Sequence, residues 1–282
     1  MRAKVGAFFW PPVVPGTLGA HPAADRTFFA VRAPGAPGVT LCLFDDDAER
    51  QVPMTRTGDT WQAEVPGVDP GQRYGFRAQG VDPAKLLVDP YALELDRRYA
   101  YDPALGRPGV DTAALVPKAI VPTPWIDGPP PPPVFAPGGL IYELNVRGFT
   151  MRHPDVPADQ RGTVAALAHP AVVAHFRKLG VAAIELMPIV AWIDERHLSP
   201  LGLVNAWGYN PVTPMALDPR LCPGGIEELR TTVAALRDAG ISVILDLVFN
   251  HSGESDEDGP TLSFRGLDPA TYARGPDGQL VN

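Results

Sequence analysis

The polar residues best suited to chemistry follow a run of aliphatic residues near the C-terminal end of the sequence. The stretch from Ile241 to Ser252 reads ISVILDLVFNHS, with Asp246 inside the run and Asn250 and His251 after it. Such a run is typical of a parallel strand covered on both faces, and these strands present polar groups at their carboxyl ends. A carboxylate, an amide and an imidazole at one strand end can bind a polar substrate and exchange protons with it. We therefore treat Asp246, Asn250 and His251 as candidate site residues.

A second candidate is the stretch from Asn205 to Pro211, which reads NAWGYNP. Trp207 and Tyr209 flank a glycine, and an amide side chain stands on each side of the pair. Aromatic rings with amides beside them can stack on a sugar ring and bond its hydroxyl groups. The same composition also suits an aromatic plug that packs a loop onto its scaffold. The sequence leaves both interpretations open.

Other polar groups carry weaker signals. Glu143, Asn145 and Arg147 alternate along the string IYELNVRGFT, so a strand there would place them on one face, as the rim of a site or as a paired structural cluster. Glu185 lies inside the next apolar run and by itself is weak evidence of catalysis. A later group of acids does not match the spacing of an EF-hand calcium loop, so we expect a solvated loop and no metal site: Glu254, Asp256, Glu257 and Asp258.

The elements that must position these groups alternate between strand and helix after residue 138. Apolar runs predict strands over Leu140 to Val146, Val181 to Ile189 and Ile241 to Phe249. Helix-spaced apolar residues lie between the runs; the first helix begins at Pro170 and ends at Gly180, and the second ends at Gly240. A closed barrel needs eight such units, and an open sheet of three would expose apolar edges. Residues 138–282 therefore predict the first three βα units of a TIM (β/α)8 barrel, so the chain looks truncated.

The N-terminal part predicts a different architecture. Residues 1–80 contain short runs rich in β-branched and aromatic residues, separated by Gly, Pro and Asp turns, which is typical of an antiparallel β-sandwich. Residues 81–137 are dense in proline and end in the run Pro129 to Pro133, which favours extended polyproline II structure and a connecting segment between domains. A docking site for a proline-recognising partner is the alternative.

Composition narrows the class of protein. The net charge is -8, and no basic cluster is present that would bind nucleic acid. Cys42 and Cys222 are distant from each other and predict two free, buried thiols in a reducing compartment. The apolar run near the N-terminus is broken by prolines, and no other stretch is long enough to span a membrane, so we expect a cytoplasmic protein. No dinucleotide, P-loop, HExxH or GxSxG motif occurs, and no cofactor is predicted.

Taken together, these strings resemble the glycogen debranching and isoamylase branch of the α-amylase superfamily, glycoside hydrolase family 13. DLVFNHS is similar to the first signature of that superfamily, DVVxNH, and NAWGYNP is similar to its NYWGYNP loop. IYELNVRGFT resembles the first barrel strand, with Asn145 where the family often has His. AKLLVDPYA at residues 84–92 is also a string of this group, and GPTLSFRGLDPATYAR at residues 259–274 is typical of debranching enzymes.

The resemblance implies a function and an arrangement of roles. The sandwich would be a carbohydrate-binding module of the family 48 type, and the whole enzyme would hydrolyse α-1,6 branch linkages of glycogen or a related α-glucan by the retaining mechanism. Asp246 would organise the site, His251 would contact the sugar at the cleaved linkage, and Tyr209 would stack on it. Trp207 and Asn250 would complete the substrate-binding group, with Asn250 either structural or facing the substrate.

The resemblance also implies an incomplete catalytic group. The nucleophile, the general acid and the stabilising carboxylate of this superfamily follow its fourth, fifth and seventh barrel strands, which lie beyond Asn282. We therefore expect no catalytic residue in this chain and no activity of the chain alone. Two alternatives remain: a non-catalytic α-glucan-binding fragment that uses Trp61 or Tyr74 of the sandwich, or a related branching or trehalose-releasing enzyme. The string from residue 259 onward favours debranching over the latter.

Overall fold

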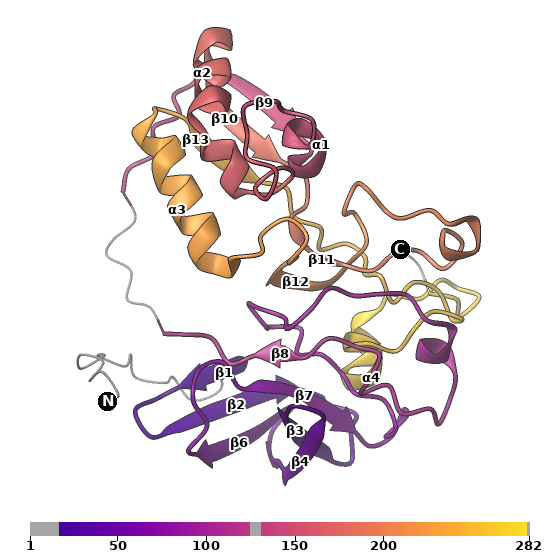
Figure 1. Ribbon diagram of the computed structural model, residues 1–282. Helices are drawn as coiled ribbons and strands as arrows, with labels where there is room; N and C mark the ends of the chain where they lie inside the picture. The colour runs from indigo at the N-terminus through magenta and orange to yellow at the C-terminus, as the bar shows by residue number, and fades with distance from the viewer. Residues whose placement is uncertain (1–16, 125–130, 281–282) are drawn as a thin grey trace. The chain divides into compact units, whose positions relative to one another are not determined.

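The chain folds into two compact units. The computed structural model describes residues 17–124 and 131–280. Within these, the first unit comprises residues 17–96, 102–124 and 254–280, and the second comprises residues 97–101 and 131–253. Figure 1 shows both units, with labels on the larger helices and on most strands.

The first unit contains two antiparallel sheets, which confirms the predicted β-sandwich. One sheet has the strand order β1-β2-β6-β5 and the other β4-β3-β7-β8. Their bounds are β1 (Gly19–Pro22), β2 (Arg26–Arg32), β3 (Val39–Asp45), β4 (Ala48–Pro53), β5 (Thr55–Thr57), β6 (Thr60–Pro66), β7 (Arg73–Ala78) and β8 (Ala119–Ile120). The core includes Phe29, Tyr74 and Phe76, whose rings meet edge to face at centroid distances of 5.0 and 5.8 Å. The sequence does not reveal β1, β4, β5 and β8. These strands are short or polar, and all four lie at sheet edges, where apolar alternation is not required.

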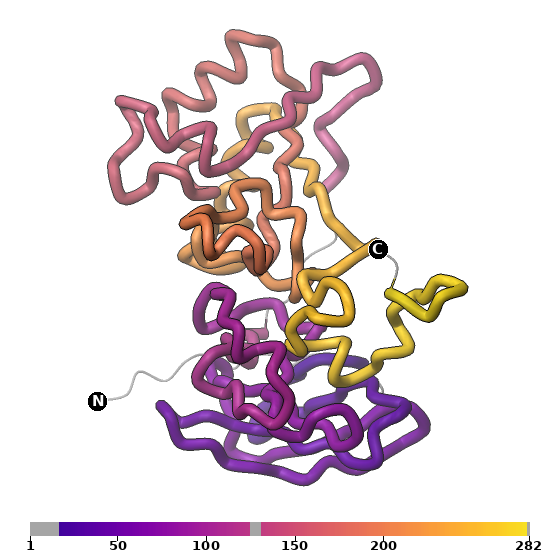
Figure 2. The backbone as a smooth tube through the Cα atoms, turned by 90° about the vertical axis from the view of Figure 1, so that its right-hand side faces the viewer, coloured from indigo at the N-terminus to yellow at the C-terminus, as the bar shows by residue number. Residues whose placement is uncertain are grey.

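Much of the proline-rich stretch packs within the first unit. Leu87 exchanges two backbone hydrogen bonds with Phe76 of β7, at 2.7 and 2.8 Å, and β8 also pairs with β7. The Val88 amide donates to the Leu262 carbonyl at 2.8 Å, so the C-terminal segment, yellow in Figure 2, runs beside this stretch. That segment contains α4 (Phe264–Leu267) and η4 (Pro269–Thr271), and the proline-rich stretch contains η1 (Pro103–Gly106). Residues 125–130, which include the start of the proline run, lie outside the described residues.

The second unit is built on a parallel sheet with the strand order β13-β10-β9. The strands are β9 (Leu140–Leu144), β10 (Val181–Leu186) and β13 (Ser242–Leu245), joined by the crossover helices α2 (Pro170–Leu179) and α3 (Gly225–Asp238). Phe176 of α2 and Leu236 of α3 share one buried cluster with Ile184 of β10, so both helices cover the same face of the sheet, as Figure 1 shows. The predicted order of strands and helices is confirmed, and α2 ends at Gly180, whose φ is +73°, as its C-cap.

The strands are shorter than the apolar runs predict. β9 ends at Leu144, and the Asn145 side chain accepts a hydrogen bond from the Gly148 amide, which caps the short helix α1 (Val146–Thr150). The expectation that Glu143, Asn145 and Arg147 alternate along one strand face is therefore wrong, because only Glu143 lies in the strand. After β10 the chain forms an unpredicted antiparallel pair, β11 (Val190–Trp192) and β12 (Pro211–Leu217). The remaining short elements of this unit are η2 (Ala165–Ala168) and η3 (Ser199–Leu201).

Two predictions from composition can be checked directly. Cys42 and Cys222 are both free and buried, as expected. Across residues 17–124 and 131–280, no helix combines the length and the apolar character that crossing a membrane would require.

Candidate functional site

The candidate site lies at the carboxyl end of the parallel sheet in the second unit. Asp246 is the residue after β13, and its amide donates to the carbonyl of Leu186, the last residue of β10, at 3.0 Å. This bond continues the sheet pairing by one residue and fixes the backbone of Asp246 beside the end of β10. The Asp246 side chain is half-buried. The sequence predicts Asp246 inside a strand that runs to Phe249, whereas β13 ends at Leu245, so the carboxylate follows directly on the end of the strand.

Tyr209 is the partner of this carboxylate. Its hydroxyl donates to Oδ2 of Asp246 at 2.5 Å, although the two residues are 37 positions apart. The hydrogen bond to Asp246, assisted by burial and by the negative charges of Glu143 and Glu185, raises the pKa of Tyr209 to about 12. The phenol therefore stays protonated at neutral pH and serves as a fixed donor. Its ring cannot rotate away without breaking this bond.

His251 joins the group through the backbone of Tyr209. Its Nε2 lies 2.8 Å from the Tyr209 carbonyl oxygen, and the side chain is half-buried. A carbonyl oxygen only accepts hydrogen bonds, so the proton of the neutral imidazole is on Nε2 and Nδ1 is left as an acceptor. The structure thus brings together Tyr209, Asp246 and His251, three of the five residues proposed from the sequence as substrate-binding.

Two more carboxylates share this end of the sheet. Glu143 of β9 and Glu185 of β10 are paired in register, and Glu185 is also paired with Ile244, two residues before Asp246. Because side chains alternate along a strand, all three acids point to the same face, opposite the one that α2 and α3 cover. That face can accept several hydrogen bonds from a ligand rich in hydroxyl groups. The sequence gives little reason to select Glu185, because the strand register that pairs it with Glu143 is a tertiary feature.

The other two predicted residues, Trp207 and Asn250, are exposed. The Trp207 side chain is 65% exposed, so it does not serve as a plug that packs its loop onto the scaffold. Asn250 is also exposed, and among the described residues neither side chain is hydrogen-bonded to the group of Tyr209, Asp246 and His251. Both remain available to a ligand.

The sandwich offers no aromatic platform at the two positions considered from the sequence. Trp61 is 8% exposed and its Nε1 donates to the Ala33 carbonyl at 3.1 Å. Tyr74 is 1% exposed and its hydroxyl donates to Asp89 at 2.7 Å. Both rings belong to the core, so the hypothesis that they bind glucan at the surface is wrong. The polar atom of each ring, Nε1 of Trp61 and the hydroxyl of Tyr74, has a buried hydrogen-bond partner, so burying the ring leaves no polar atom unsatisfied.

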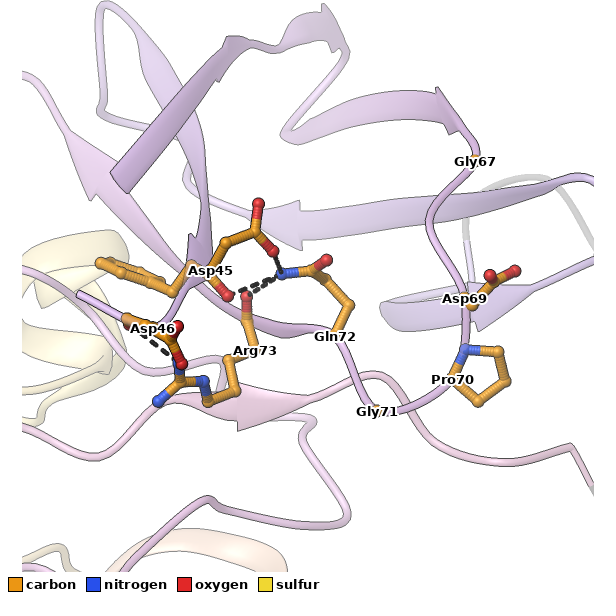
Figure 3. Close-up of a pocket in the computed structure, with 9 residues that line it drawn as sticks. Asp45, Asp46, Gly67, Asp69, Pro70, Gly71, Gln72 and Arg73 are labelled. Carbon is orange, nitrogen blue, oxygen red and sulfur yellow. Dashed lines mark hydrogen bonds and ion pairs between the residues drawn. The ribbon is translucent and has the colours of Figure 1, made fainter. Parts of the chain in front are cut away.

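The sandwich does have a polar cavity of about 440 Å³. It lies between residues 44–46 and residues 67–73, and Figure 3 shows the Gln72 amide donating toward Asp45 and the Arg73 guanidinium facing Asp46. The side chains at its mouth are mainly polar, and its aromatic lining residue, Phe44, is only 4% exposed.

The acidic loop predicted to be solvated is partly buried. Glu254 is fully buried and its carboxylate accepts hydrogen bonds from the amides of Leu262, Ser263 and Arg265, at 2.7 to 2.9 Å. The Tyr272 hydroxyl donates to the same carboxylate at 2.5 Å. The expectation of a solvated loop is therefore wrong for Glu254, which organises the C-terminal segment of the first unit.

The fold and the site together define a class: an antiparallel β-sandwich followed in the sequence by parallel βα units that carry a polar, aromatic site at their carboxyl edge. Residues 17–92 match the model of carbohydrate-binding module 48, the isoamylase N-terminal domain, as predicted. The chain is 45% identical to the glycogen debranching enzyme of Yersinia enterocolitica over 92% of its length. This match confirms the resemblance to glycogen debranching enzymes. It covers 42% of the relative, so the chain spans less than half the length of that enzyme.

Solved structures support the same fold. A pullulanase from an Anoxybacillus species is 26% identical, with a TM-score of 0.71, and the match covers 93% of this chain and 38% of that one. A type I pullulanase from Bacillus subtilis, solved with maltose, gives a TM-score of 0.71 at 24% identity and covers 94% of this chain and 37% of that one. At that identity, the second comparison speaks to the fold alone.

Proposed function

We propose that this chain forms the N-terminal module and the first three βα units of the catalytic barrel of a debranching-type glycoside hydrolase. The substrate would be glycogen or a related branched α-glucan, and the reaction would be hydrolysis of α-1,6 linkages with retention of configuration. The observation that carries the proposal is the group of Tyr209, Asp246 and His251 at the carboxyl edge of a parallel sheet. The 45% identity to a glycogen debranching enzyme supports the same conclusion.

The group suits a sugar ring at the cleaved linkage. The Tyr209 ring, fixed by Asp246, offers a flat apolar face on which the C–H bonds of a glucose unit can pack. Nδ1 of His251 and the second oxygen of Asp246 can accept hydrogen bonds from sugar hydroxyls. These contacts bind and orient the sugar; they do not break the glycosidic bond.

The nucleophile and the general acid that would cleave the glycosidic bond are not among the residues of this group. Retaining hydrolysis uses two carboxyl groups about 5 to 5.5 Å apart, one as nucleophile and one as general acid. Asp246 is engaged by the Tyr209 hydroxyl. Glu143 and Glu185 are the next-to-last residues of their strands, and the resemblance assigns neither of them as nucleophile or general acid. Following the resemblance, we propose that the catalytic carboxylates belong to barrel strands outside these 282 residues, and that the chain binds α-glucan without turning it over.

Binding and turnover by the 282-residue protein test this proposal. We expect isothermal titration calorimetry to detect maltotetraose, and the variant Tyr209→Ala to weaken binding by about tenfold or more, because it removes both the stacking face and the partner of Asp246. Tyr74→Phe, a tyrosine change in the sandwich core, is the control and should leave binding unchanged. Binding that is equal in wild type and Tyr209→Ala would refute the assigned site. Release of reducing ends from glycogen by the chain alone would refute the expected lack of turnover.

A further inference from the structure

Asn205 begins the NAWGYNP loop. Its backbone amide and both polar atoms of its side chain are hydrogen-bonded, although Trp207 in the same loop is exposed. The residue itself is only 9% exposed. Its Oδ1 accepts hydrogen bonds from the amides of Trp207 at 2.8 Å and Gly208 at 2.9 Å. Its Nδ2 donates to Oε1 of Glu195 at 2.9 Å, and its own amide donates to Asp194 at 2.9 Å. One amide side chain therefore fixes the backbone of the two residues that precede Tyr209.

The turn at residues 206–208, which Asn205 binds, requires a glycine at position 208 and hydrogen bonds from neighbouring side chains. Gly208 has a φ of +83°, and a Cβ placed there would lie 2.8 Å from the Pro188 carbonyl oxygen. Only glycine fits a backbone that is both left-handed and this close to its neighbour. A second amide, that of Asn145, donates to the Ala206 carbonyl at 2.9 Å and ties the turn to the end of β9.

The side chains that this turn presents face outward. Trp207 is 65% exposed, and Leu203 and Val204 before it are 55% and 65% exposed. Exposed apolar residues on a rigid, hydrogen-bonded loop indicate a binding surface. A ring that is already held in place loses less conformational freedom when a ligand stacks on it, so the affinity is higher.

We infer that Asn205 is a positioning residue, which holds Trp207 and Tyr209 in the arrangement that accepts an α-glucan. The inference rests on the proposed function and adds a residue to it. It also explains why an amide is needed. An aspartate at position 205 would keep the acceptor for the two backbone amides, but it would place a carboxylate 2.9 Å from that of Glu195. The other oxygen of Glu195, Oε2, is buried and has no hydrogen-bond partner among the described residues, so Glu195 relies on the Asn205 amide.

Two measurements on the 282-residue protein test the inference. Hydrogen exchange, read by mass spectrometry on a peptide covering residues 203–210, follows the amides that Asn205 binds. Titration with maltotetraose follows binding. For Asn205→Ala we expect exchange in this peptide to accelerate and the Kd to rise, each by roughly tenfold or more, because the variant removes all three hydrogen bonds of the Asn205 side chain. Gln160→Ala, a change at an exposed amide in the same unit, should alter neither.

The variant Asn205→Asp separates positioning from general stability. At neutral pH we expect it to bind maltotetraose as weakly as Asn205→Ala, because the new carboxylate repels Glu195. The new carboxyl would face Glu195 and also Asp194, whose Oδ1 accepts from the backbone amide of residue 205. Acid adds a proton to this group and relieves the repulsion, so the affinity of Asn205→Asp should recover as the pH falls while that of Asn205→Ala does not. Recovery in Asn205→Asp alone would show that the affinity is lost through the contact with Glu195. If Asn205→Ala fails to fold, Gly208→Ala displaces the same turn without changing Asn205 and should raise the Kd to a similar extent.

The outcomes are distinguishable. Equal maltotetraose affinity in wild type, Asn205→Ala and Gly208→Ala would overturn the positioning role and leave the proposed function standing. A failure of Asn205→Asp to recover at low pH would overturn the role of the Glu195 contact and hence the inference. No maltotetraose binding by the wild type would overturn the proposed function, and the inference with it.

Discussion

The buried carboxyl of Asp89 makes the stability of the first unit depend on pH in a direction opposite to that of most acids. Asp89 is fully buried; its Oδ2 accepts a hydrogen bond from the Tyr74 hydroxyl at 2.7 Å, and its Oδ1 accepts one from the Tyr91 amide at 2.9 Å. Burial disfavours the charged carboxylate, and these two hydrogen bonds offset that effect only in part. The pKa of Asp89 therefore rises from 3.8 to about 6.

The sign and size of the effect follow from this shift. Because the folded-state pKa lies above the unfolded-state value, the folded protein holds the proton more tightly. The stability that Asp89 contributes is fully present below about pH 4 and is lost as the pH rises through about 6. A shift from 3.8 to about 6 corresponds to about 3 kcal/mol of unfolding free energy, most of it lost between pH 4 and pH 7.

Asp89→Asn removes this titration with little change in shape. The asparagine keeps an acceptor for the Tyr91 amide, and its NH2 group can donate to the Tyr74 hydroxyl, which is free to turn. We expect the stability of the variant relative to wild type to rise by about 2 to 3 kcal/mol between pH 4 and pH 7, because only the wild type must bury a charge at the higher pH.

Pulsed thiol labelling in urea can report each unit separately. Cys42 is buried in the first unit and Cys222 in the second, so labelling each with dithiodipyridine, which reacts in acid, gives one unfolding curve per unit. The rise in the stability of Asp89→Asn relative to wild type between pH 4 and pH 7 should be seen in the unfolding curve of Cys42 and not in that of Cys222. A relative stability that is the same at both pH values, or that falls as the pH rises, would refute the burial argument; an equal shift at Cys222 would show that it is not local to the first unit.

Two further acids of the first unit give stability predictions, and that for Glu49 depends on pH with the sign usual for an acid. The two hydrogen bonds from Arg77 to Glu49, at 2.9 and 2.7 Å, hold the pKa of Glu49 at about 2, so this pair stabilises the fold above about pH 4.5 and its contribution is lost as the pH falls through about 2. Glu49→Gln should cost about 2 kcal/mol in urea unfolding at pH 7, whereas an equally stable variant at pH 7 would contradict the pairing. Glu254→Gln should cost about 3 kcal/mol, because an NH2 group would face buried donors where an acceptor stood. The control Tyr272→Phe removes one of these donors and should cost about 1 kcal/mol, and equal losses in the two variants would contradict the assigned role of Glu254.

The features that could be predicted from the sequence depend on local patterns. α2 and α3 follow from apolar residues spaced three and four apart and from Gly180 and Gly240, whose positive φ values suit the ends of helices. The parallel strands follow from unbroken apolar runs, which require burial on both faces. Where a polar side chain offered the backbone another partner, the pattern gave the wrong boundary, as at Asn145, which ends β9 by capping α1.

The two architectures, the order of their elements and the candidate residues could be predicted from the sequence, because periodicity, turn residues and motif strings are local properties. Which of those residues meet depends on the folded structure. It placed the Tyr209 hydroxyl on Asp246, 37 residues away, and paired Glu143 with Glu185 through strand register. It also buried Trp61, Tyr74 and Glu254, each of which the sequence had allowed at the surface. Burial and long-range hydrogen bonds depend on how distant segments pack, and no local pattern encodes that packing.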